Sequence, residues 1–351
     1  MKHCGEPCGE PPTKGVGMRS SSRWGLFPGV AALIAVIALG LAAAGCGSSN
    51  SSTSASPTPS NSGSSAAATW TDADLAALQA DPALKPMLPA GMTEIRVASD
   101  VPYPPWEYFD PATSKNPAGF DYDLSQAIAK KIGVPASFNE TPFDSIILSI
   151  KGGKNDMIMS DMYDNLEREG QGVSFVDYAY DGTSILVKKG NPDGISNLDS
   201  LAGKTVACES GTTQQAFLQK LDKQFKSESK APIKILALPN QPAALLAVTS
   251  GRAVGDLTDH STASYIALKT NNGNTFEVVS DPSAPNGYDP QIVGIGMVAK
   301  NTALIDTVQK ALQALIDEGA YQKIIAKYGL LPVDSAMVNQ GGKSPSPSPT
   351  Q

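Results

Sequence analysis

Charged side chains follow a short apolar strand in the stretch IMSDMYDNLEREG. The stretch reaches Asp161, Asp164 and Arg168 within eleven residues of its start. An arginine guanidinium binds a carboxylate through two parallel hydrogen bonds, and an aspartate carboxylate binds a cation. On a solvated turn the same three residues would do neither, so the rest of the sequence must decide between a binding cleft and an ordinary turn.

Further candidate side chains stand at other predicted strand ends and beside this stretch. They are Asp100, Tyr103 and Trp106 after the strand EIRVAS, Phe143 at a helix start, Ser160 and Tyr163 beside Asp161, Thr212 and Thr213 after TVACE, and Asp259 after AVGDLT. Taken singly, each has a structural explanation: threonine or aspartate often caps a helix, and aromatic residues near prolines pack in cores or loops.

Taken together, the candidates fit the chemistry of a free amino acid. Arg168 offers a fork for the α-carboxylate, and the turn of residues 210–213 offers backbone N–H groups at a helix start. Asp259 offers a carboxylate to the α-ammonium. Tyr103, Trp106 and Phe143 would form apolar walls. The sequence therefore predicts an amino-acid-binding cleft.

Strand and helix patterns alternate through the body of the chain, which predicts an α/β fold with parallel-dominated sheets flanked by helices. The segment DYDLSQAIAKKIG has apolar residues four apart and ends at Gly133, as an amphipathic helix does. A long helical region over 302–329 is expected to break near Gly319. In such folds ligands bind beyond the carboxyl ends of the strands, where the candidates lie.

The N-terminal region predicts export. Residues 24–45 are uncharged and mostly apolar, and Arg19 and Arg23 precede them, so 1–45 is expected to be a signal peptide, with Met18 as the expected start. The end LAAAGC resembles the bacterial lipobox, which implies lipidation at Cys46. An uncleaved membrane-spanning helix is the alternative. Either way, we expect a protein on the outer face of the cytoplasmic membrane.

Low-complexity segments flank the predicted folded body. Residues 46–92 are expected to form a Ser/Pro-rich spacer with one short helix capped by Thr71 and Asp74. Residues 335–351 are expected to form a disordered tail. The folded body is then 93–334, which is long enough for two lobes.

Composition excludes several function classes. Residues 1–45 hold four Lys/Arg and two Asp/Glu, so their removal takes the net charge from −7 to about −9, which argues against nucleic acid. Cys208 is the single cysteine after Cys46, so no disulfide framework is expected. The sequence contains no metal-binding or nucleotide-binding motif beyond the weak trio His3, Cys4 and Cys8, and we expect no cofactor and no metal.

The ordered motifs of the body resemble bacterial extracellular solute-binding proteins of family 3, the amino-acid-binding components of ABC importers. VPYPPWEY, GFDYDLSQAIAKKIG, FDSIILSIKGGKNDMIMS, NLEREGQGVSFVDY and LAGKTVACESGTTQQ carry the resemblance. It implies a two-lobed type II periplasmic-binding-protein fold. Lobe 1 would be 93–186 and 292–334, lobe 2 would be 187–291, and hinge strands would lie near 183–187 and 292–298.

The resemblance also implies residue roles. Arg168 would hold the α-carboxylate with Thr213 and Thr212, Asp259 would hold the α-ammonium, and Tyr103 and Phe143 would pack the ligand side chain. This chain departs from the family pattern at Asp161 and Tyr163, where relatives have small or hydroxyl residues. A second carboxylate beside Asp259 favours a ligand with extra positive charge or amine donors, so a basic or amide amino acid is expected.

The expected partners are a free amino acid, the permease and ATPase subunits of an importer, and the membrane through a lipid anchor; we expect a monomer and no enzyme activity. Two alternatives remain open. Some relatives of the fold are dehydratases, in which Asp161 or Glu209 could act as a proton donor. A ligand sensor that works with a separate membrane receptor is the other.

Overall fold

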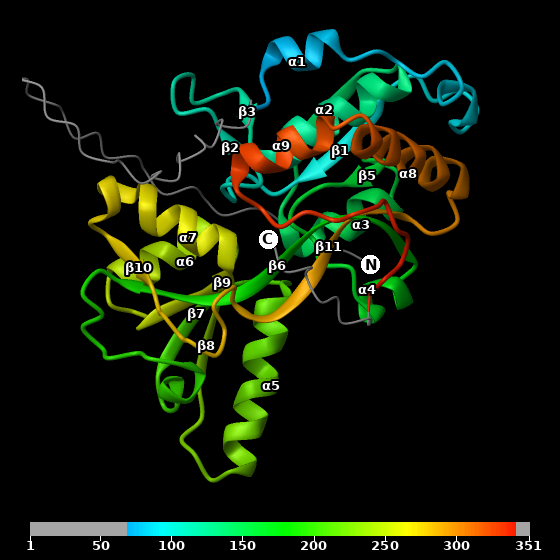
Figure 1. Cartoon of the computed structure of the whole chain (residues 1–351). Helices are drawn as coiled ribbons and strands as arrows, with labels where there is room; N and C mark the ends of the chain where they lie inside the picture. The colour runs from blue at the N-terminus through cyan, green and yellow to red at the C-terminus, as the bar shows by residue number, and fades with distance from the viewer. Residues whose placement is uncertain (1–68, 342–351) are drawn as a thin grey trace, which may run out of the picture. The chain divides into compact units, whose positions relative to one another are not determined.

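The computed structural model describes residues 69–341 (Figure 1). The predicted signal peptide, Cys46, residues 46–68 of the predicted spacer and residues 342–351 lie outside this range. The helices are α1 Asp72–Ala77, α2 Phe120–Ile132, α3 Ile146–Lys151, α4 Leu166–Gly170, α5 Thr213–Ser227, α6 Gln241–Thr249, α7 His260–Lys269, α8 Thr302–Asp317 and α9 Ala320–Tyr328. Within the described range, no helix combines the length and the apolar character that a membrane crossing needs.

The strands form one mixed sheet and one short hairpin. They are β1 Ile95–Ser99, β2 Tyr108–Phe109, β3 Pro117–Ala118, β4 Ala136–Glu140, β5 Met157–Ile158, β6 Val173–Lys188, β7 Thr205–Glu209, β8 Lys234–Leu238, β9 Gly255–Asp259, β10 Phe276–Val278 and β11 Tyr288–Val298. The order across the sheet is β4-β1-β5-β11-β6-β9-β7-β8, and β10 also pairs with β6. Both flanks of the sheet are parallel, while β6 and β11 pair antiparallel at its centre.

The long strands β6 and β11 connect two separate sets of cores. Residues 176–179 of β6 pack in a core with α2, α8 and α9, which we call the first core, and residues 173–175 contribute to a smaller core with α3. Ile185 and the residues of β6 after it pack with α5 to α7. On β11, Tyr288 packs against the second set and Ile292 belongs to the first. On β6 the passage from one set to the other lies between Ala179 and Ile185 and overlaps the expected hinge 183–187. On β11 it lies between Tyr288 and Ile292, just before the expected hinge 292–298. Figure 1 shows β6 and β11 side by side between the two groups of elements.

Sequence patterns account for the helices that cover the first core. Leu124, Ile128 and Ile132 of α2 are all fully buried, as their spacing of four predicts. Gly133 ends α2 in the left-handed conformation. Gly319, also left-handed, separates α8 from α9, so the predicted break is confirmed.

The packed structure extends beyond both predicted ends of the folded body. Trp70, Leu84 and Leu88, which were assigned to the spacer, are buried in the first core. On the tail side, Ala336 joins the same core and the Gly341 N–H donates to Asp164 at 2.8 Å. Isolated apolar residues in low-complexity sequence give little periodic signal, which is why these segments were interpreted as spacer and tail.

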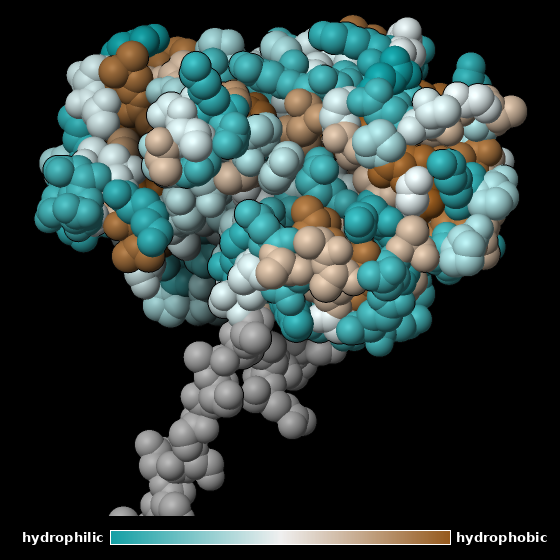
Figure 2. Space-filling model, turned by 90° about the horizontal axis from the view of Figure 1, so that it is seen from above, coloured by the Kyte–Doolittle hydropathy of each residue, from teal (hydrophilic) through white to brown (hydrophobic). Residues whose placement is uncertain are grey.

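Figure 2 shows one face of the molecule coloured by hydropathy. Hydrophilic residues cover most of this face, and hydrophobic ones lie in separate small patches among them. Scattered apolar residues of this kind are normal on a protein surface and do not by themselves mark an interface.

The burial of Trp70 gives a stability prediction. Trp70→Ala removes a side chain that is 5% exposed in the first core, so we expect the free energy of unfolding to fall by about 3 kcal/mol. Urea denaturation of the ligand-free protein measures the change. Leu148→Ala, at a residue that is 68% exposed, is the control and should change stability by less than about 0.5 kcal/mol. Equal midpoints for the two variants would mean that residues before 93 are only a spacer.

Candidate functional site

Most of the predicted site residues line one small cavity, which we call the inner cleft. Its lining residues are Asp100, Tyr103, Glu107, Phe143, Ser160, Asp161, Arg168, Glu209, Thr212, Thr213, Gln214 and Asp259. They come from the ends of β7 and β9 and from the segments that follow β1, β4, β5 and β7. The cavity measures about 10 Å³, which is room for about one water molecule. A larger ligand therefore enters only when the walls move apart.

Arg168 is buried and held in place by its own helix. The Asn165 side chain caps α4 by accepting from the Arg168 N–H at 2.9 Å, and Arg168 Nη1 donates to the Tyr163 carbonyl at 2.8 Å. The guanidinium lies 5.5 Å from the centre of the Phe143 ring. Burial lowers the pKa of Arg168 to about 10, which still leaves it charged at neutral pH. The interpretation of Arg168 as an ordinary surface arginine is excluded.

Asp259 accepts hydrogen bonds from three side chains at the inner cleft. Tyr103 donates to one carboxylate oxygen at 2.6 Å, while Tyr163 and Gln214 (2.6 Å) donate to the other. Asp259 stands at the N-terminus of α7, but its side chain makes no capping hydrogen bond there. The alternative that Asp259 serves only as a helix cap is therefore excluded. Burial raises the pKa of Asp259 to about 6.

Trp106 and Tyr163 do not line the inner cleft, although both were predicted site residues. The Trp106 ring is fully buried and packs edge-on against Phe120 and Tyr178 in the first core. Its Nε1 donates to Ser261 Oγ at 2.8 Å. Tyr163 is buried in the same core and reaches the site only through its hydroxyl on Asp259. These large rings fill space beside the cleft because the first core offers them more apolar contact.

The two threonines differ in what they do. Thr212 caps α5, since its hydroxyl accepts from the Gln215 N–H at 3.2 Å and donates to the Glu209 carbonyl at 2.8 Å. The Thr212 side chain therefore acts as a helix cap. Thr213 is the first residue of α5, so its backbone N–H belongs to the open N-terminal end of that helix.

Three residues of the inner cleft were missed as ligand-site candidates. Glu107 follows Trp106 directly, and its carboxylate accepts from Ser160 Oγ at 2.7 Å. Glu209 is the last residue of β7 and was considered only as a proton donor. Gln214, the second residue of α5, donates to Asp259. The position of Glu209 at a strand end was a usable signal, whereas nothing in the sequence distinguished Gln214 from a surface glutamine.

Two carboxyl groups from opposite sides meet at one end of the inner cleft. Asp100 follows β1, accepts from the Phe143 N–H at 3.1 Å, and adjoins the Glu209 side chain. Burial and the Asp100 carboxyl raise the pKa of Glu209 to about 11. At neutral pH Glu209 therefore keeps its proton, and the two carboxyl groups are paired with each other through it.

Asp161 is the other carboxylate without a cation. It has a positive φ of 44°, and its N–H donates to Asp121 Oδ2 at 3.0 Å. Both of its carboxylate oxygens are buried and accept no N–H or neutral O–H from the described residues, and its carboxyl group lies against that of Asp259. Burial and the neighbouring Asp259 and Asp181 carboxylates raise the pKa of Asp161 well above its usual value.

A wider mouth cavity adjoins the inner cleft. It measures about 380 Å³ and shares Phe143, Arg168, Thr212 and Thr213 with the cleft. At this mouth a Cβ placed on Gly211 would lie 3.1 Å from the Asp144 Cα, so the two sides of the cleft touch there.

The fold and this site agree with the sequence relationships of the chain. Residues 95–330 match the family model described as bacterial extracellular solute-binding proteins, family 3. The chain belongs to this family. The histidine-binding periplasmic protein of Escherichia coli (strain K12) is 31% identical over 244 residues, which cover 67% of this chain and 86% of that protein.

Solved structures give the same result. An ancestral arginine-binding protein bound to arginine is 30% identical, has a TM-score of 0.58, and aligns over 68% of this chain and 98% of its own length. The ancestral amino acid-binding protein AncCDT-1, a precursor of cyclohexadienyl dehydratase, is 29% identical with a TM-score of 0.56 over 67% and 95% of the two chains. The fold is the expected two-lobed α/β fold of periplasmic binding proteins. The relatives are named as binding proteins, and this chain is a solute-binding protein rather than an enzyme.

The Asp100 and Glu209 pair predicts how stability depends on pH. A carboxyl whose pKa is raised in the folded state binds a proton that the unfolded state releases, so the folded protein loses stability as pH rises above about 4.5. Glu209→Gln removes this loss. We expect the variant to be more stable than the wild type by at least about 1 kcal/mol at pH 8, with a smaller gain at pH 5.

Thermal melts of ligand-free protein at the two pH values measure this gain. Asp144→Asn, which changes an exposed neighbouring carboxylate, is the matched control and should show no pH-dependent gain. A Glu209→Gln variant that is less stable than the wild type at pH 8 would contradict the conclusion that the Asp100 and Glu209 pair destabilises the folded protein at that pH.

Proposed function

We propose that this protein is an extracytoplasmic, lipid-anchored receptor that captures a free basic amino acid in the inner cleft and delivers it to an ABC importer. The observation that carries the proposal is the balance of charge in the cleft. Asp100, Glu107, Asp161, Glu209 and Asp259 line it, against Arg168 as its cation. Buried carboxylates are stable only when cations, protons or hydrogen-bond donors meet them.

A basic amino acid supplies charge at each place where the cleft needs it. Its α-carboxylate would bind Arg168 and the backbone N–H groups that open α5. Its α-ammonium would bind Asp259 and Asp161. Its side-chain cation would enter between Asp100 and Glu209, in place of the proton that this pair shares.

Energy estimates agree with useful affinity. Each hydrogen bond to a charged group contributes about 1.5–3 kcal/mol, and three or four of them, less the entropic cost of association, reach about −8 kcal/mol, a micromolar affinity. The names of two relatives support the same ligand class, since one is a histidine-binding protein and another was solved with arginine bound.

Closure of two lobes would explain how a ligand enters so small a cavity. The division into lobe 1 (93–186 and 292–334) and lobe 2 (187–291) is supported by the two sets of cores, with the passage between them on β6 after Ala179 and on β11 before Ile292. Rotation about these two strands would open the cleft between Arg168 on one side and Asp259 on the other. The closed form would be the one that the permease and ATPase subunits read.

The ligand class is tested by isothermal titration calorimetry with L-arginine, L-lysine, L-ornithine, L-histidine, L-glutamine and L-glutamate. We expect a basic amino acid to bind most tightly and glutamate most weakly, because the glutamate side chain would bring another carboxylate to Asp100 and Glu209. Arg168→Ala should weaken binding of the preferred ligand at least about 100-fold, the loss of about 3 kcal/mol.

The matched control for this experiment is Arg252→Ala, which removes an exposed arginine outside the inner cleft and should leave affinity unchanged. Tightest binding of glutamate would overturn the charge argument. An Arg168→Ala variant with wild-type affinity would overturn the proposed carboxylate clamp.

The lipid anchor follows from the lipobox-like end of the signal segment. We expect the exported full chain to fractionate with membranes and to carry a diacylglycerol-type mass increase at Cys46, whereas Cys46→Ser should appear in the soluble fraction or remain uncleaved. Mass spectrometry of the N-terminal peptide reads both results. An unmodified Cys46 in membrane-bound protein would indicate a spanning helix instead.

A further inference from the structure

Three buried carboxyl groups meet at the wall of the inner cleft. Asp161 follows β5, Asp181 lies on β6, and Asp259 ends β9. Each offers a carboxylate oxygen, and these oxygens all lie within 4.8 Å of one another. All three residues are at most 6% exposed. We call this group the carboxylate cage. Two of its members belong to the inner cleft, but Asp181 does not line it.

Two of the three carboxyl groups in the cage accept hydrogen bonds from neighbouring N–H, hydroxyl or amide groups, and the third accepts none of these. Asp181 accepts from the N–H groups of Gly182 at 2.7 Å and Ser261 at 3.3 Å, and Asp259 accepts from the tyrosines and Gln214 described above. Both oxygens of Asp161 are buried, accept no N–H or neutral O–H from the described residues, and meet only the carboxyl groups of the cage itself. An unpartnered buried carboxylate aimed at two others marks a place for a cation.

The spacing of the cage suits an ammonium group. A point equidistant from three atoms that are at most 4.8 Å apart lies within about 2.8 Å of each in an equilateral arrangement, which is the N···O distance of about 2.7–2.9 Å for a charged hydrogen bond. An ammonium has three N–H donors, so it can meet three carboxylate oxygens at once.

Charge then requires a proton in the cage before the ligand arrives. Among the titratable groups that face the cage, Arg168 is the cation, and it is shared by several acids. The others are Tyr103, Tyr163, Tyr178, Glu107, Asp121, Glu209 and Asp256. Burial and Asp259 raise the pKa of Asp181 to about 8, and burial raises the pKa of Asp259 to about 6. At neutral pH the empty cage therefore retains hydrogen on at least one carboxyl.

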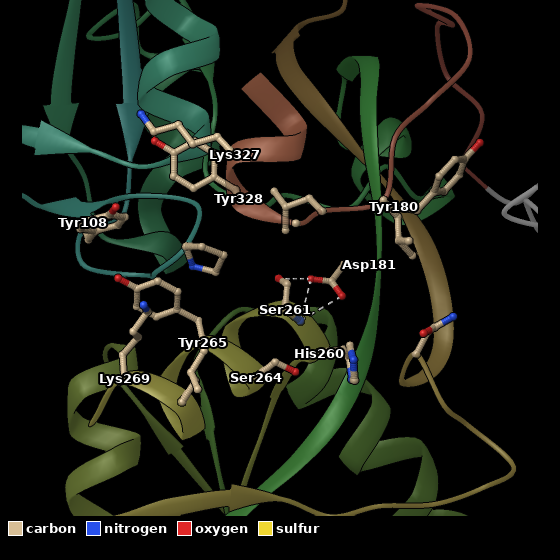
Figure 3. Close-up of a pocket in the computed structure, with 16 residues that line it drawn as sticks. Tyr108, Tyr180, Asp181, His260, Ser261, Ser264, Tyr265, Lys269, Lys327 and Tyr328 are labelled. Carbon is tan, nitrogen blue, oxygen red and sulfur yellow. Dashed lines mark hydrogen bonds between the residues drawn. The ribbon is translucent and has the colours of Figure 1, made fainter. Parts of the chain in front are cut away.

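Asp181 gives such a proton a separate route to solvent. It lines an outer cavity of about 600 Å³, which lies between α7, the end of α9 and the middle of β6. Figure 3 shows Asp181 at the edge of this cavity with its carboxylate hydrogen-bonded to Ser261, and with His260 nearby. The cavity has room for water beside Asp181 even when the inner cleft is closed.

We propose that Asp161, Asp181 and Asp259 together bind the ammonium of the ligand, and that one proton leaves the cage through Asp181 when the ammonium enters. The O–H bond of a carboxyl breaks, its proton passes to the buffer, and the carboxylate is neutralised by the ligand cation. The inference rests on the proposed function and adds Asp181 as a specificity residue that does not line the cleft.

Proton release is measured by titration calorimetry of the full chain with its preferred basic amino acid at pH 7. Phosphate and Tris buffers differ in ionisation enthalpy, so the difference between the two binding enthalpies gives the number of protons released. We expect close to one. We also expect Kd to fall as pH rises from 6 to 8, by up to about tenfold per pH unit.

Substitutions show whether the released proton comes from the carboxylate cage or from another buried carboxyl group. Asp161→Asn should reduce the released proton by at least half and flatten the pH dependence, and Asp181→Asn should do the same without removing a side chain that lines the cleft. Asp177→Asn is the control, because Asp177 is also buried with unpartnered oxygens but does not line the cleft, and it should behave as the wild type.

The outcomes distinguish this inference from the proposed function. Tight binding of a basic amino acid with no proton release and a flat pH profile would overturn the cage and leave the function intact. Wild-type proton release in Asp161→Asn and Asp181→Asn would overturn the cage in the same way. Failure of every amino acid to bind between pH 6 and 8 would overturn both.

Discussion

The burial of carboxyl groups around one arginine is the constraint on which the rest of this site depends. Arg168 is held by the cap of a short helix, and Asp259 is held by two tyrosine hydroxyls and an amide. Asp161 accepts no N–H or neutral O–H from the described residues, and Asp100 and Glu209 are paired with each other instead of with a cation. A cleft built in this way is incomplete without positive charge, and that requirement selects the class of ligand more sharply than the apolar walls do.

The sheet explains how these groups come together. Asp100 and Asp161 follow β1 and β5, and Glu209 and Asp259 end β7 and β9, so the parallel flanks of the sheet bring all four carboxyl groups to one edge. The antiparallel pair β6 and β11 passes between the two sets of cores. Hydrogen bonds across the cleft, such as those from Tyr103 and Tyr163 to Asp259, link elements that are about 100 or more residues apart in sequence. The same groups would have to separate for a ligand to enter.

Sequence patterns predicted the fold and most of the candidate site because helix periodicity and strand ends are set by residues that are close together in the sequence. Helix periodicity placed the faces of α2, and strand ends placed Arg168, Asp161 and Asp259. Patterns did not reveal which aromatic ring would turn into the core, so Trp106 was assigned to the wrong environment. Gln214 and the core residue Trp70 were missed for a related reason, since only tertiary packing distinguishes them from surface or spacer residues.

Native mass spectrometry of protein purified from an exporting host tests the central claim most directly. The account predicts a retained ligand whose mass is that of a single basic amino acid and which is lost in Arg168→Ala. A retained acidic amino acid, or a basic amino acid retained equally by Arg168→Ala, would contradict it.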